Sequence, residues 1–311
     1  MKRKMIATFL LIGISCTLLT GCKSSDYKKA VEYQEAGDYA SALDIYLSID
    51  GYDNYKDTAE RINTCQAMIE AIGKFETASS SATAKNEELD TAISTAEFII
   101  AENAAALNET LYPALESAIS TAKAAKVDVP EMPATEDKIL TTVEQLNAID
   151  YSTVLFDLST AQEALEKSIK QYALVDAPNE SYIIQCLKTV PGIVDISAVT
   201  EDNDPNGNMN KAGGYTAQVF FSSDLIDQSS VYGTTVIEKG TNCGGSIEVY
   251  SNVDDAASRE AYLATFDGGI LASGSHKVIG TVLVRTSDNL TASQQKELEA
   301  NIIAALTNIE E

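Results

Sequence analysis

The residues best placed to do chemistry form an acidic, asparagine-rich loop in the C-terminal half of the chain. Oxygen-bearing side chains recur there at alternate positions with Gly207 sixth, a spacing that lets a short loop surround a hard cation such as Ca²⁺. The twelfth position, where such a loop needs a carboxylate, is Gly213. The alternative is an exposed turn between strands, because Asn, Asp and Gly favour turns. The candidate calcium ligands are Asp202, Asp204, Asn206 and Asn210 through side chains and Asn208 through its carbonyl.

Cys243 and His276, the only histidine, could together supply a thiol nucleophile and its base. Such a pair needs direct contact and a third group that orients the imidazole, and neither residue lies in a nucleophile signature. The sequence also has no Cys-x-x-Cys or His-x-x-x-His spacing and no phosphate-binding loop that ends in Lys-Ser/Thr. Arg259 and Arg285 could bind an anion, but pairing with a nearby Asp or Glu is the stronger expectation. We therefore expect no enzyme and no cofactor other than the candidate calcium.

Two cysteines, Cys186 and Cys243, fall in the same C-terminal region. An extracellular setting, for which the N-terminus argues below, permits a disulfide between them. The alternative is that both are buried free thiols, because cysteine behaves as a small hydrophobic residue.

The region that carries these residues, 177–311, is richer in Gly and β-branched residues than the chain before it. We expect one sheet with helices packed mainly on one face, an α+β fold. A capping-box spacing, Thr291-x-x-Gln294, predicts the start of the final helix. The other predicted helices span about 180–189 and 254–266, and the predicted strands span 193–199, 215–221, 231–237, 246–250 and 278–285.

Residues 22–176 have the period of amphipathic helices and predict an all-α region of hairpins or a small bundle. We divide it into 22–72 and a helical spacer, 73–176, in which two prolines predict an extended connector at 127–135. In the first part, small residues and tyrosines alternate where two antiparallel helices would touch; they are Ala30, Tyr33, Gly37, Tyr39, Ala42 and Tyr46. This pattern resembles a single tetratricopeptide-type hairpin. One repeat favours a packing module over a peptide-binding groove.

The first 21 residues have the pattern of an export signal. Lys2, Arg3 and Lys4 precede the apolar stretch from Met5 to Leu19, which is short for a membrane span. Leu19-Thr20-Gly21-Cys22 resembles the lipobox of bacterial prolipoproteins. The resemblance implies cleavage between Gly21 and Cys22 and a diacylglycerol, with its palmitate-type chains, on the Cys22 thiol. More than one acyl chain gives durable anchoring, so we expect a lipoprotein at the outer face of the cell membrane.

The chain is strongly acidic, with 46 Asp and Glu against 22 Lys and Arg and a formal charge of -24. Loss of the signal would remove three of the basic residues and no acidic one. A protein that neutralises phosphates needs a basic face. We therefore expect no nucleic-acid partner.

Residues 180–311 resemble an uncharacterised domain of secreted lipoproteins of Gram-positive bacteria. The similar stretches are Asn203–Asn206, Gly213–Thr216, Cys243–Tyr250, Asp255–Tyr262 and Val282–Arg285. Because no activity is assigned to that domain, the resemblance implies location and domain limits alone.

Together these patterns predict a membrane-anchored extracellular lipoprotein with a non-enzymatic recognition or scaffold role toward an envelope protein or wall component. One alternative is an envelope hydrolase that uses carboxylates such as Asp202 and Glu248, which would have to face one cleft about 5 to 10 Å apart. Another is that the helical half is the active part and captures a partner.

Overall fold

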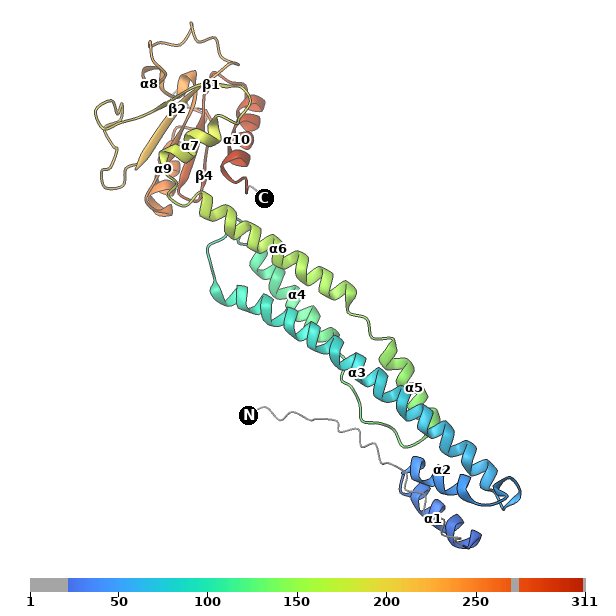
Figure 1. Cartoon of the computed structure of the whole chain (residues 1–311). Coiled ribbons are helices and arrows are strands. Elements are labelled where there is room, and N and C mark those ends of the chain that lie inside the picture. The colour runs from blue at the N-terminus through green and yellow to red at the C-terminus, as the bar shows by residue number, and fades with distance from the viewer. Residues whose placement is uncertain (1–21, 270–273, 310–311) are drawn as a thin grey trace. The chain divides into compact units, whose positions relative to one another are not determined.

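The computed structural model describes residues 22–269 and 274–309 (Figure 1). The predicted signal peptide, with Gly21 of the predicted cleavage site, lies outside the described residues. The chain divides into two compact units. The first contains the chain up to Glu88 and Lys126–Tyr151, and the second contains Leu89–Ala125 and the chain from Ser152 onward. Over the described part of the chain, no helix is both long and apolar enough to span a bilayer.

In the first unit, a helical hairpin packs its small and aromatic residues together as predicted. Ala30, Ala42 and Tyr46 are fully buried in one cluster with Cys65. Between the two helices, Gly37 adopts a positive φ of 82°, and the Asp38 side chain caps the second helix by accepting the Ser41 N–H. The elements of this unit are α1 (Lys23–Glu35), α2 (Tyr39–Ser48), the short helix η1 (Tyr52–Asn54), the first part of α3 (Thr58–Glu102) and α5 (Glu136–Asn147).

The helices of the second unit bury the stripes that their 3.6-residue period predicts. Helix α4 (Leu111–Ala125) packs along α6 (Ser152–Leu174). Their buried residues include Leu115, Ile119 and Leu165. Pro113 stands in the first turn of α4, where its missing N–H costs little. The predicted helical region is therefore confirmed, and α3 runs through it as one uninterrupted helix of 45 residues.

The C-terminal part of the second unit is a five-stranded antiparallel sheet in the order β1-β2-β3-β5-β4. This confirms the predicted fold class, an α+β fold that follows a helical region. The strands are β1 (Ile193–Ala198), β2 (Ala217–Ser223), β3 (Gly244–Val249), β4 (His276–Ile279) and β5 (Val282–Thr286). The main helices are α7 (Glu180–Leu187), α9 (Val253–Ala264) and α10 (Ala292–Leu306).

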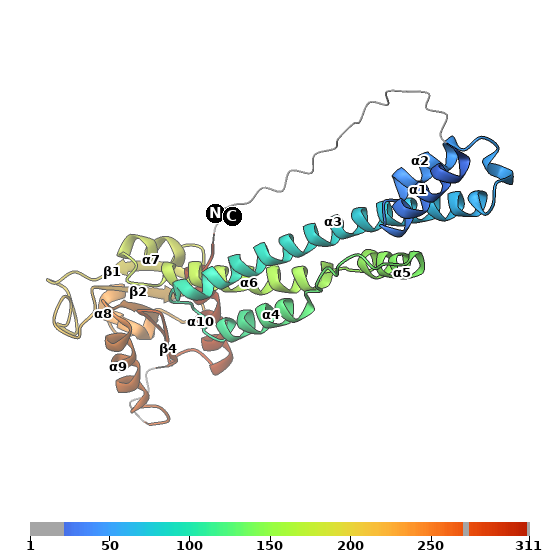
Figure 2. The ribbon, with the colours of Figure 1, turned by 90° about the horizontal axis from the view of Figure 1, so that it is seen from below.

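The two faces of the sheet differ in polarity. Phe221, Ile247 and Val284 point to one face and join the main core with residues of α7 and α10. The opposite face is polar and fully or almost fully buried; its residues include Gln218, Ser246, Glu248 and Arg285. Helix α9 lies on this second side through a smaller cluster that contains Ala256, Leu263 and Leu283. Figure 2 shows α7 and α9 on opposite sides of the sheet.

The structure corrects three local predictions. The strand expected at 231–237 is wrong, because Thr235 and Glu238 form a capping box that starts a short helix, α8 (Val236–Lys239). The strand expected at 278–285 is two strands, because Gly280 turns the chain with a φ of 57°. The helix expected at about 254–266 is α9, which starts earlier, at Val253, because the side chain of Asn252 caps it.

At Gly245, near the start of β3, the backbone of β5 and the ring of Phe221 both come close to the β3 backbone. A β-carbon at Gly245 would lie 2.2 Å from the carbonyl oxygen of Arg285 and 2.4 Å from the ring of Phe221. The absence of a side chain therefore lets β5 and the Phe221 ring close on both sides of β3.

Candidate functional site

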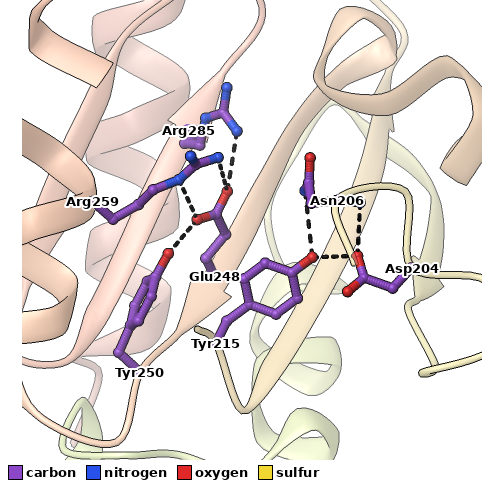
Figure 3. A network of polar contacts seen from close by, with 7 residues as sticks. All are labelled: Asp204, Asn206, Tyr215, Glu248, Tyr250, Arg259 and Arg285. Atoms are coloured by element: carbon purple, nitrogen blue, oxygen red, sulfur yellow. Dashed lines mark hydrogen bonds and ion pairs between the residues drawn. The ribbon is translucent and has the colours of Figure 1, made fainter. Parts of the chain in front are cut away.

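A group of charged and hydroxyl-bearing side chains in the C-terminal domain surrounds Glu248 (Figure 3). The Glu248 side chain is 0% exposed. Its Oε1 accepts a hydrogen bond from Nη1 of Arg285 at 3.0 Å and a longer one from Nη2 of Arg259 at 3.5 Å. Its Oε2 accepts from Nε of Arg259 at 3.1 Å and from the Tyr250 hydroxyl at 2.6 Å.

Three elements bring this network together. Residues two apart on a strand share a face, so Ser246 and Glu248 of β3 point to the same side, and Tyr250 continues the alternation. Arg285 stands on β5 directly opposite Ser246. Arg259 comes from α9. The expectation that Arg259 and Arg285 pair with an acid is confirmed, and the acid is Glu248.

Two members of the network, Arg259 and Tyr250, have shifted pKa values. Burial alone would lower the pKa of the Arg259 guanidinium, but the charge and hydrogen bonds of Glu248 raise it. Burial, together with the negative charge of Glu248, raises the pKa of the Tyr250 hydroxyl, so this group remains a donor at neutral pH. Two guanidiniums and one hydroxyl together occupy both oxygens of the Glu248 carboxylate. This carboxylate is well suited to fix the positions of its neighbours.

Two further polar side chains lie on the same face of the sheet without a partner. Gln218 is paired with Glu248 across β2 and β3, and Ser246 precedes Glu248 by two residues. Both are 0% exposed. Among the residues that the structure describes, neither amide atom of Gln218 nor the Ser246 hydroxyl has a hydrogen-bond partner. Most buried polar groups in proteins are hydrogen-bonded, so these atoms mark the face as unusual.

The acidic loop before β2 is organised around Asp204. Its Oδ2 accepts the backbone N–H groups of Asn208 at 2.6 Å and Met209 at 2.8 Å, and its Oδ1 accepts the N–H of Asn206 at 2.9 Å and the hydroxyl of Tyr215. Burial would raise the pKa of the Asp204 carboxyl, but these hydrogen bonds lower it to about 2. The carboxylate therefore holds the loop in shape.

The remaining candidate calcium ligands are engaged elsewhere or exposed. The Asn206 amide donates to the Tyr215 hydroxyl, and the Asn210 amide donates to Glu201. Asn210 adopts a positive φ of 59°, and Asp202 is exposed. Across 22–269 and 274–309, no three or more His, Cys, Asp or Glu side chains are grouped so as to hold a metal. The geometry favours the exposed turn that we gave as the alternative to a calcium site.

The cysteines of the C-terminal domain, Cys186 and Cys243, are both buried and free in the structure, which is the alternative that we gave to a disulfide between them. The Cys243 thiol donates toward backbone carbonyls, with Gly240 O nearest at 3.0 Å, and burial raises its pKa to about 11. Burial also raises the pKa of Cys186. His276 contacts Asp267 at 3.2 Å. Cys243 therefore has the character of a packed thiol rather than of a nucleophile.

Cys186 also lines the edge of a surface groove of about 530 Å³ between the ends of α6 and α10 and helix α7. Lys170, Leu174 and Tyr182 line it too. The Tyr182 hydroxyl is bound to the carbonyl of Leu306, and the rest of the lining mixes apolar side chains with polar ones, among them Gln185, Thr189 and Asn308.

Sequence reasoning missed Gln218, Tyr215 and Tyr250 as members of the site. The alternation Ser246, Glu248, Tyr250 was a usable signal for a polar face, because those residues are spaced by two in a strand. The partner strands and their register were not visible in the sequence. No protein-family model, curated protein or solved structure matches this chain.

Proposed function

We propose that this chain is a membrane-anchored extracellular lipoprotein with a non-enzymatic recognition or scaffold role at the cell envelope. A diacylglycerol on the Cys22 thiol would hold it at the outer face of the cell membrane. The observation that carries the proposal is the lipobox-like Leu19-Thr20-Gly21-Cys22. Cys22 is exposed and directly precedes α1, so acylation of its thiol would disturb no buried contact.

The contacts of Glu248 support recognition over hydrolysis. A glycoside hydrolase needs two carboxyl groups that face a substrate, one of which exchanges a proton. Glu248 is buried, and both of its oxygens are hydrogen-bonded to arginine. Asp202, the other carboxylate of the hydrolase alternative, is exposed in the loop before β2. The C-terminal domain is therefore better suited to bind an envelope protein or wall component than to cleave one.

The proposal is tested by fractionation of a bacterial host that expresses the full chain. We expect the chain in the membrane fraction, digestible by protease added to intact cells, with the mass of a Cys22-started, acylated protein. Cys22→Ala should release it from the membrane fraction or leave the leader attached. Cys16→Ala is the matched control, since it removes a thiol that lies within the leader. Recovery of the wild-type chain in soluble form, with residues 21 and 22 still joined, contradicts the proposal.

A further inference from the structure

We infer that the polar face of the sheet beside Glu248 binds a small carboxylic acid that also carries a hydrogen-bond donor, such as a hydroxy acid. This inference rests on the proposed recognition function and names a ligand class for it. The site is formed by Gln218 and Ser246 from the sheet and Arg259 from α9.

The first support is the set of unpartnered atoms. Gln218 and Ser246 are 0% exposed, and within the described residues the Gln218 Nε2, the Gln218 Oε1 and the Ser246 Oγ have no partner. Such atoms in a native interior call for a partner that the protein itself does not supply, either ordered water or a bound group. Gln218 presents a donor and an acceptor, so a single oxyanion does not satisfy it. A ligand with both an acceptor and a donor does.

The second support is the guanidinium of Arg259, which is partly exposed to solvent. Arg259 contacts Glu248 through Nε and Nη2, and its Nη1 is the atom assigned to the ligand. Its side chain keeps 22% exposure, whereas that of Glu248 keeps none, so Arg259 stands between the buried atoms and solvent. A guanidinium prefers carboxylates, with which it forms charge-assisted hydrogen bonds.

The third support is the arrangement of these groups around one residue. Gln218 is the cross-strand partner of Glu248, Ser246 is its neighbour on the same face of β3, and Arg259 is hydrogen-bonded to it. Glu248 therefore contacts Arg259 directly and lies opposite Gln218 on the neighbouring strand. In this arrangement the ligand carboxylate accepts from Arg259, the Gln218 amide nitrogen and the Ser246 hydroxyl, while its hydroxyl donates to the Gln218 oxygen.

Titration calorimetry and thermal melting of the full chain test the site with three probes. Glycolate has a carboxylate and a hydroxyl, acetate lacks the hydroxyl, and 1,2-propanediol lacks the charge. We expect a saturable heat and a rise in melting midpoint with glycolate, weaker binding of acetate and no response to the diol, because a ligand that binds the folded state raises its stability.

Substitutions at the proposed site show whether its residues produce the response to glycolate. Gln218→Leu and Ser246→Ala should each weaken glycolate binding by about tenfold or more, the loss of about one hydrogen bond. Gln218→Asn, which keeps an amide, should retain part of it. Ser222→Ala is the matched control, since Ser222 is equally buried on β2 but already contacts Asp195. The melting curve of each variant shows whether it is folded.

No saturable response in the folded wild-type chain, or equal binding by wild type and Gln218→Leu, overturns the inference and leaves ordered water as the partner of these atoms. Either result leaves the membrane fractionation of Cys22→Ala untouched, so failure of the ligand class is distinguishable from failure of the proposed function.

Discussion

Glu248 and Arg285 form an ion pair across neighbouring strands, with 3.0 Å between Oε1 and Nη1 and side-chain exposures of 0% and 10%. Removal of two charges from water is costly, and an ion pair in such a place is maintained only when its geometry and remaining hydrogen bonds compensate. Here Arg259 and Tyr250 supply those additional bonds to the same carboxylate. The hydrogen bonds and ion pairs on this polar face of the sheet therefore meet at one carboxylate, that of Glu248.

Glu248→Gln should destabilise the chain by about 3–5 kcal/mol, because it leaves Arg285 buried without its counter-charge. Urea unfolding at neutral pH measures the change. Glu297→Gln, the same substitution at an exposed position of α10, should change stability by less than about 0.5 kcal/mol. Equal, small effects of the two variants would show that the ion pair contributes little.

Asp204 should make stability depend on pH in the acid range. Its folded pKa of about 2 lies below the ordinary 3.8, so its contribution is present above about pH 4 and is lost as the pH falls toward 2. After allowance for solvent screening we expect about 1 kcal/mol. Asp204→Asn should therefore lower stability at pH 7, and the difference from wild type should vanish near pH 2. The exposed Asp202→Asn is the control, and an equal pH dependence in both variants would contradict the assignment.

Millimolar calcium should leave the melting midpoint unchanged, because Asp204 already accepts three backbone N–H groups and a hydroxyl. Differential scanning calorimetry with and without the ion, at constant ionic strength, makes the comparison. A rise in midpoint with calcium that Asp204→Asn abolishes would restore the loop as a cation site.

Only Cys22 should react with a thiol reagent in the folded chain. We expect one labelled thiol at neutral pH in protein made without its leader or lipid, because Cys65, Cys186 and Cys243 are buried. Burial raises the pKa of Cys243 to about 11, which further reduces its thiolate content. Unfolding in guanidinium chloride should expose all four thiols. A loss of two thiols in the unfolded, unreduced protein would reveal a Cys186–Cys243 disulfide.

Elements with a local signal were predictable, and contacts between distant segments were not. The capping box of Thr291 and Gln294 is formed by residues three apart, and the structure contains it as predicted. The β-branched run near Val231 suggested a strand, but the second capping box, Thr235 with Glu238, prevailed there. The choice depended on how the segment packs, which β-propensity does not determine.

The candidate site shows the same limit. Alternating oxygens at Asp202 to Asn210 suggested a cation, whereas the carboxylate of Asp204 satisfies nearby backbone amides instead. Asp and Asn often bond their own following backbone, so this outcome was accessible to sequence reasoning. The partners of Glu248 come from β5 and α9, and neither the register of β5 nor the placement of α9 has a sequence signal.

The bare backbone at Gly245 has an evolutionary consequence. Any larger residue there would push against the Arg285 carbonyl on one neighbour and the Phe221 ring on the other. Both neighbours would have to retreat, and Arg285 would be drawn away from its acid. Descendants of this protein could exchange many surface acids freely, yet a selection for folded chains should return glycine at this one position.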